Sequence, residues 1–198
     1  MTNYSGSIYL TSTGLSASPV REAFSTLAKM RKYKSVAIVT TAAAEKEKGK
    51  HIQLAKKQLQ ALQFERIDFA DLEASQPTDF SVYDVIYVCG GNTYKLLHFA
   101  RKVAFDQSVK QLLQKDGCYI GVSAGSILLG PLIDIANDPN DIGVKDYAGL
   151  HIVDMVVLPH YEPSQEARAV AYEKRTKLKV LRQTNDEALV IEWRHPVR

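Results

Sequence analysis

Short apolar runs alternate along the chain with longer stretches in which apolar residues recur every three or four positions. Many of the short runs are apolar almost throughout, which is typical of strands covered by helices on both faces. Strands are predicted over residues 8–10, 36–40, 67–69, 85–88 and 118–122, and then over 155–158 and 188–191. Helices are predicted over about 20–32, 44–63, 94–115 with a break near 104–105, and 163–177.

Strand–helix–strand alternation favours parallel pairing with right-handed crossovers. The sequence therefore predicts an α/β fold, a three-layer sandwich around a mostly parallel sheet, as a single domain over residues 1–198. The segment 131–149 lacks periodicity and is rich in Asp, Asn, Pro and Gly, so we expect a long loop or hairpin there. Ligands of such sheets bind outside the carboxyl ends of the strands, which is where chemistry is sought.

Composition narrows the class of protein. With 45% hydrophobic and 24% charged residues the chain can bury a core, and a net charge of +3 spread among mixed signs gives no nucleic-acid footprint. No apolar stretch reaches the roughly 20 residues of a membrane span, and no secretory signal is visible, so we expect a soluble, cytoplasmic protein. Cys89 and Cys118 lie in apolar strands without metal-ligand spacing and the five histidines do not cluster, so no metal or cofactor is expected. The oligomeric state, monomer or homodimer, stays open.

The first candidate for chemistry is the run Gly121-Val122-Ser123-Ala124-Gly125, which joins a predicted strand to a helix-like segment. A Gly-x-Ser-x-Gly sequence in this setting is typical of a nucleophile elbow, in which small neighbours let a strained serine stand above the sheet. The alternative is a helix cap, for which Ser123 or Ser126 would serve.

A second strand ends in Gly90-Gly91-Asn92-Thr93. An oxyanion hole needs amides from two loops, and Gly91 and Ala124 could supply one each. The alternative is an ordinary strand-to-helix turn capped by Asn92 or Thr93.

A third predicted strand ends at Pro159-His160-Tyr161, and of the five histidines only His160 ends a strand in this way. We expect it on the same edge of the parallel sheet as Ser123, which makes it the candidate general base. An acid should orient the imidazole, and the residues alone leave the choice open among Asp134, Asp138, Asp141, Asp146 and Glu162.

Four motifs in order, Gly90-Gly91-Asn92-Thr93, Gly121 to Ser126, Asn137-Asp138 and Pro159-His160-Tyr161, resemble the aspartyl dipeptidase (peptidase E) family of the S51 serine peptidases, which also includes the cyanophycinases. The resemblance implies a fold like the class I glutamine amidotransferase domain, flavodoxin-like in its layers. It implies Ser123 as nucleophile, His160 as base, Asp138 as third member, and Gly91 and Ala124 as oxyanion donors.

The resemblance also implies hydrolysis of short peptides, including dipeptides with an N-terminal aspartate. Asn92 and Thr93 would contact the substrate, and Arg168 could pair with a substrate carboxylate. The order Ser, Asp, His also occurs in α/β-hydrolases, but 37 positions between Ser123 and His160 leave little room for that fold.

Three other functions remain as alternatives. The first is a non-catalytic binding or regulatory protein on the same fold, and the second is an esterase or amidase acting on a non-peptide substrate. The third, a nucleotide-binding flavodoxin-like domain, would need a phosphate loop after the first strand, and residues 11–14 fit no such pattern.

Overall fold

A computed structural model describes residues 6–76 and 78–193, and its centre is a six-stranded sheet. The strand order is β3-β2-β4-β5-β1-β8, and every neighbouring pair is parallel except β1 with β8. The strands are β1 (Ser7–Thr11), β2 (Ser35–Val39), β3 (Arg66–Ala70), β4 (Val85–Val88), β5 (Cys118–Val122) and β8 (Ala188–Glu192). The predicted α/β fold with a mostly parallel sheet is confirmed.

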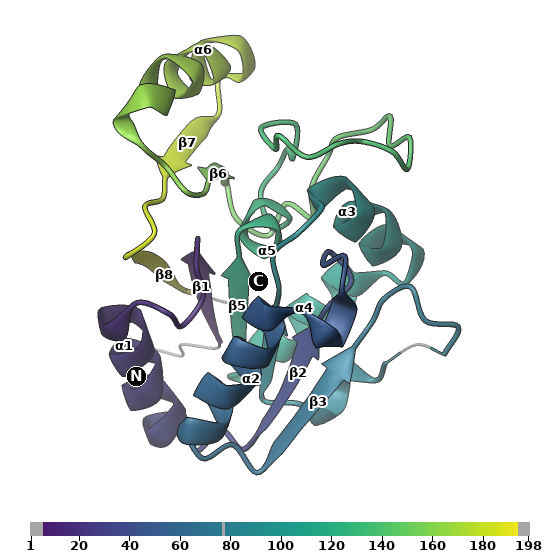
Figure 1. Cartoon of the computed structure of the whole chain (residues 1–198), viewed down its shortest axis with the longest axis vertical. Coiled ribbons are helices and arrows are strands. Elements are labelled where there is room, and N and C mark those ends of the chain that lie inside the picture. The colour runs from purple at the N-terminus through teal and green to yellow at the C-terminus, as the bar shows by residue number, and fades with distance from the viewer. Residues whose placement is uncertain (1–5, 77, 194–198) are drawn as a thin grey trace, which may run out of the picture.

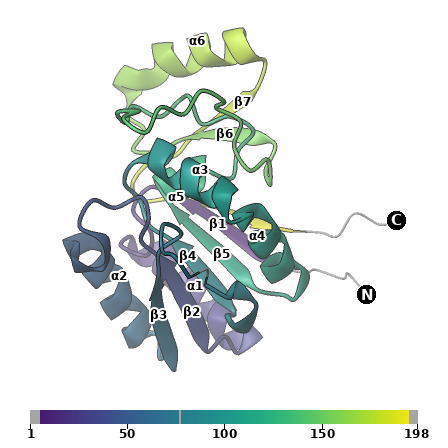
Figure 2. The same ribbon diagram turned by 90° about the vertical axis from the view of Figure 1, so that its right-hand side faces the viewer.

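Helices cover both faces of this sheet because successive strand residues point to opposite sides (Figures 1 and 2). On one face, α1 (Ser18–Arg31) and α2 (Lys50–Ala61) pack against residues such as Ile38 and Ile120. On the other face, α3 (Thr93–Lys102), α4 (Phe105–Gln114) and α5 (Ala124–Ile127) pack against residues such as Val39 and Tyr119. The predicted break in the third helix lies at Ala104, whose φ of 49° is left-handed.

A second, smaller sheet stands beside the first. It consists of β6 (Met155–Leu158) and β7 (Lys179–Arg182), paired in parallel and joined by the short η3 (Pro163–Gln165) and α6 (Glu166–Thr176). Figure 1 shows this unit above the carboxyl ends of the main strands. The sequence places the strand at 155–158 in the main sheet, which is wrong because β6 pairs with β7. The strand β7 is not predicted from the sequence, because its four residues include the charged Lys179 and Arg182.

The remaining segments are irregular or short. The 3-10 helices η1 (Lys46–Lys48) and η2 (Phe80–Val82) lie in connections between strands. Residues 131–149 form a hairpin-like excursion closed by an isolated bridge between Leu132 and Ala148. Arg101 fastens this segment to α3, since its guanidinium donates to the carbonyls of Asp146 and Ala148. Among the described residues no helix is both long and apolar enough to cross a membrane.

Candidate active site

Ser123 lies at the turn between β5 and α5, above the carboxyl end of the sheet. Its φ of 49° and ψ of −105° form a conformation that L-residues rarely adopt, as a nucleophile elbow requires. Tight packing explains the flanking glycine: a Cβ on Gly125 would lie 2.5 Å from the carbonyl oxygen of Val88. The sequence therefore makes this turn by removing side chains where β4 and α5 approach each other.

The two serines of this turn have different environments. The side chain of Ser123 makes no capping hydrogen bond. Ser126 is fully buried, and its hydroxyl accepts from the Thr11 amide at 2.9 Å while the carbonyls of Thr11 and Gly121 each lie 2.8 Å away as acceptors. Ser126 therefore ties β1 to the elbow, and Ser123 keeps its hydroxyl free for other partners.

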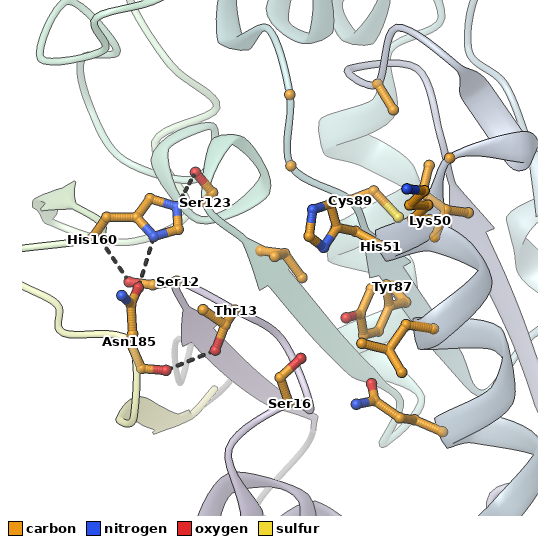
Figure 3. A pocket seen from close by; sticks show the side chains of 18 of the residues that line it. Ser12, Thr13, Ser16, Lys50, His51, Tyr87, Cys89, Ser123, His160 and Asn185 are labelled. Atoms are coloured by element: carbon orange, nitrogen blue, oxygen red, sulfur yellow. Dashed lines mark hydrogen bonds between the residues drawn. The ribbon is translucent and has the colours of Figure 1, made fainter.

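His160, which follows β6, is the partner of that hydroxyl (Figure 3). Its Nε2 lies 3.1 Å from Ser123 Oγ, and its Nδ1 lies 2.8 Å from Asn185 Oδ1. Because an amide oxygen only accepts, Nδ1 must carry the proton in this pair. In the neutral ring Nε2 is then the acceptor, which is the tautomer a general base for Ser123 needs.

The loop after β1 holds both His160 and Asn185 in place. Ser12 Oγ accepts from the backbone N–H of His160 and donates to the carbonyl of Gln183, each at 2.9 Å. Thr13 Oγ1 donates to the carbonyl of Asn185 at 2.7 Å. The hydrogen bond that the His160 N–H donates to Ser12 also holds His160 at its left-handed φ of 54°. Sequence reasoning missed Ser12, Thr13 and Asn185, since it weighed residues 11–14 only as a phosphate loop.

The structure gives the acids considered for His160 other partners. Asp138 accepts a hydrogen bond from the Thr93 amide at 2.8 Å. Asp134 bonds Tyr172 and Arg175, Asp146 pairs with Arg101, Glu162 forms a capping box with Gln165, and Asp141 is exposed. Over residues 6–76 and 78–193 no carboxylate hydrogen-bonds His160, and the neutral amide of Asn185 occupies the position expected for Asp138.

The loop from Gly90 to Thr93 lies against the nucleophile. A Cβ on Gly90 would lie 3.2 Å from Ser123 Cβ, and one on Gly91, whose φ is 139°, would lie 2.1 Å from the Ala42 carbonyl oxygen. In the described part of the chain, the backbone amides of Gly91 and Ala124 donate no hydrogen bond. Two free amides beside Ser123 are compatible with an oxyanion hole.

Asn92 and Thr93 differ in how their side chains are used. Asn92 caps α3, because its Oδ1 accepts from the Lys95 amide at 2.8 Å, and its Nδ2 donates to the Pro139 carbonyl at 2.7 Å. Thr93 is fully buried, yet its hydroxyl has no hydrogen-bond partner among the described residues. Buried polar atoms without partners are rare and call for an explanation.

Two cavities meet at Ser123 and His160. The larger, about 1080 Å³, extends toward α1 and α2. The smaller, about 200 Å³, is lined on its polar side by Thr93, Asp138 and Arg168. Arg168 reaches it from α6 and donates one hydrogen bond to the Ile135 carbonyl. The pair of Ser123 and His160 is thus open to solvent on two sides.

The thiol of Cys89 is not activated as a nucleophile in the large cavity. Cys89 lines it, but burial raises the pKa of the thiol to about 12, so the reactive thiolate is absent at neutral pH. Burial also raises the pKa of Cys118. Among the described residues there is no group of three or more His, Cys, Asp and Glu side chains that could hold a metal ion.

Comparison with known protein families agrees with the arrangement of Ser123 and His160. Residues 8–192 match the sequence profile of peptidase family S51. The chain belongs to peptidase family S51. Membership in S51 makes the protein a serine-type peptidase.

Individual proteins similar to this S51 chain agree with that assignment. An uncharacterized peptidase of Listeria monocytogenes is 28% identical in an alignment of 174 residues that covers 83% of this chain and 85% of the relative. Peptidase E of Shewanella oneidensis is 38% identical over 78 residues, which are 39% of this chain and 33% of the relative.

Two solved structures share the fold of this S51 chain. The crystal structure of a candidate peptidase E from Listeria monocytogenes superposes with a TM-score of 0.68 at 21% identity, covering 96% of this chain and all of the other. A peptidase from an acI-B1 Actinobacterium gives 0.68 at 20% identity, covering 97% and 85%.

Proposed function

We propose that this peptidase hydrolyses short peptides, among them dipeptides with an N-terminal aspartate, through Ser123, His160 and Asn185. The observation that carries the proposal is the hydrogen-bonded series from Ser123 Oγ through the imidazole to the Asn185 amide, with distances of 3.1 and 2.8 Å. A serine hydroxyl is a weak nucleophile until a base accepts its proton, and that base needs a fixed tautomer.

The reaction would proceed in two acyl transfers. Ser123 Oγ attacks the peptide carbonyl while His160 Nε2 takes its proton, and the amides of Gly91 and Ala124 stabilise the oxyanion. His160 then protonates the leaving amine as the C–N bond breaks, which leaves an ester on Ser123. Water, deprotonated by His160, attacks this ester and releases the acid.

Asn185 plays the part that an aspartate has in the common form of this mechanism, with one physical difference. Its amide oxygen orients the ring by accepting from Nδ1, but it carries no charge to attract the imidazolium that forms during attack. Asn185 is therefore proposed as a positioning residue that holds the base in register with Ser123.

The small cavity supports a restriction to short peptides with a free N-terminus. It combines the carboxylate of Asp138, the guanidinium of Arg168 and the unpaired hydroxyl of Thr93 beside Ser123. Opposite charges that line one cavity complement an N-terminal aspartate, whose ammonium would face Asp138 and whose carboxylate would face Arg168. At about 200 Å³ the cavity has space for one small residue on the acyl side of the scissile bond.

The decisive experiment is hydrolysis of a dipeptide library by the native chain, Ser123→Ala and Ser75→Ala. Ser75 is an exposed serine that lines neither cavity, so it is a matched control. We expect cleavage of Asp-Xaa members that Ser123→Ala reduces by several orders of magnitude and Ser75→Ala leaves unchanged. Unchanged hydrolysis by Ser123→Ala would refute the proposal.

A fluorophosphonate probe tests the nucleophile without assuming a substrate, since only an activated serine reacts with it. Labelling of the native chain and not of Ser123→Ala, with no dipeptide cleaved, would replace the peptide proposal by an esterase or amidase function. Absence of labelling would indicate a non-catalytic protein. Arg168→Gln tests the aspartate preference, and we expect it to lower kcat/KM for Asp-Xaa about tenfold or more.

A further inference from the structure

The larger cavity is lined by neither Asp138 nor Arg168 and is built from several separate segments. The ends of β4 and β5 line one part of it, and the loop that leads into α1 and the first turns of α2 line another. Figure 3 shows Ser123, His160 and Asn185 on one side of it and Tyr87, Cys89 and His51 on the other. Its apolar lining consists of Ala17, Ala43, Ala44, Ile52, Leu54, Tyr87, Cys89 and Val122.

The size of this cavity exceeds what hydrolysis of a minimal dipeptide requires. At about 1080 Å³ it is larger than the ~300–1,000 Å³ typical of pockets that bury a drug-sized ligand. A Gly or Ala side chain would leave most of it filled with water against apolar walls. A bulky apolar group would remove that water, which is favourable in proportion to the apolar area covered.

Leu54 marks the wall as a surface for an apolar partner. The apolar residues of α2 that pack into the core are Ile52, Ala55 and Leu59. Leu54 lies off that stripe and is 44% exposed, while it also lines the cavity. Its side chain is therefore dispensable for packing α2 on the sheet but available to whatever enters the cavity.

Charge does not select the occupant. The charged residues that line the cavity carry both signs, with Lys50 and Glu45 near the start of α2 and Asp186 beside Asn185. Because these charges oppose one another, the apolar wall is the feature that distinguishes one ligand from another.

We infer that this cavity binds the residue on the leaving side of the scissile bond and selects a bulky apolar side chain there. The inference rests on the proposed function, which assigns the small cavity with Asp138 and Arg168 to the acyl side. The preferred substrates are then dipeptides such as Asp-Leu and Asp-Phe, with Asp-Ala and Asp-Gly as poor ones.

The experiment compares kcat/KM for these four dipeptides in the native chain and in two variants of the wall. We expect Asp-Leu and Asp-Phe to exceed Asp-Ala by about tenfold or more, the discrimination that a few methylenes give in an apolar pocket. Leu54→Asp should lower the ratio of Asp-Leu to Asp-Ala at least about fivefold, because it places a charge where the side chain binds. Ala44→Trp fills the cavity and should lower the ratio of Asp-Phe to Asp-Ala.

Met30→Asp is the matched control, since Met30 is a 67% exposed apolar residue on α1 that does not line the cavity. The inference would be overturned if the native chain cleaved Asp-Leu and Asp-Phe no better than Asp-Ala. It would also be overturned if Leu54→Asp and Met30→Asp had the same ratio of Asp-Leu to Asp-Ala. In either case, hydrolysis of Asp-Ala would still uphold the proposed function. Faster cleavage of Leu-Asp than of Asp-Leu would overturn the assignment of the cavity to the leaving side. Failure to cleave any of these dipeptides would overturn both proposals.

Discussion

The unpaired hydroxyl of Thr93 makes a prediction that separates stability from activity. Replacing Thr93 by Val keeps the shape of the side chain and removes only the hydroxyl. That hydroxyl is buried without a hydrogen-bond partner among the described residues, and Thr93 is one of the residues that line the small cavity beside Ser123. We therefore expect Thr93→Val to be at least as stable as the native chain and to have a lower kcat/KM.

The magnitudes follow from the two environments. Burying a hydroxyl without a partner costs about 1–3 kcal/mol, so its removal should raise the free energy of unfolding by up to about that amount. We expect the hydroxyl to gain a partner in the enzyme–substrate complex, and a neutral hydrogen bond contributes about 0.5–1.5 kcal/mol net. Its loss should lower kcat/KM for Asp-Xaa dipeptides by about 2- to 13-fold.

The assay pairs urea unfolding with steady-state kinetics, and Thr41→Val is the control. Thr41 is equally buried, but its hydroxyl donates to Asp71 at 2.9 Å and accepts from the Leu72 amide at 2.7 Å. Removing that hydroxyl leaves the Leu72 amide without its acceptor, while Asp71 keeps its bonds to Lys46 and the Glu73 amide. We therefore expect Thr41→Val to lose about 1–3 kcal/mol of stability.

The reasoning would be refuted if Thr93→Val lost as much stability as Thr41→Val. It would also be refuted if Thr93→Val kept full activity at unchanged or higher stability. In the first case the hydroxyl has a partner in the folded protein, and in the second the substrate does not use it.

Two further predictions concern His160 and the small sheet. Asn185→Ala removes the acceptor that fixes the ring of His160, so kcat should fall about tenfold or more. Asn185→Asp keeps an acceptor and should retain most of kcat. An alanine variant with the kcat of the native chain would argue against a positioning role. Hydrogen bonds from Arg182 lower the pKa of Glu173 from 4.5 to about 2, so the stability they add is complete above pH 4.5 and is lost as pH falls toward 2. Thermal melts at pH 5 and pH 3 should show a larger drop in Tm for the native chain than for Glu173→Gln.

The main sheet could be predicted from the sequence because its strands are short, continuous apolar runs. The predicted bounds 85–88 and 118–122 coincide with β4 and β5. The small sheet could not, since β7 has two apolar residues between charged ends and becomes a strand only by pairing with β6. Periodicity reports on local burial, whereas the choice of sheet for β6 depends on tertiary packing.

The candidate site also has one part that the local sequence predicts and one part that depends on tertiary packing. The elbow at Ser123 follows from its flanking glycines, a local property of five consecutive residues. The contact of Asn185 with His160 follows from the position of a polar loop between β7 and β8, which Thr13 fixes through a backbone carbonyl. The polar run 183–187 carries no local pattern that distinguishes one member. Motif order therefore indicates Asp138, whereas tertiary packing brings Asn185 to His160.

The division of the strands into two sheets has a consequence for how activity is lost. Ser123 belongs to the six-stranded sheet, whereas His160 and Asn185 lie in segments that leave β6 and β7. No strand of one sheet is hydrogen-bonded in a ladder to a strand of the other in the described part of the chain. Local unfolding of the smaller sheet would separate base from nucleophile while the larger sheet stays folded. Heat inactivation should then precede the loss of most secondary structure, and the enzyme's working temperature range would be set by its smallest sheet.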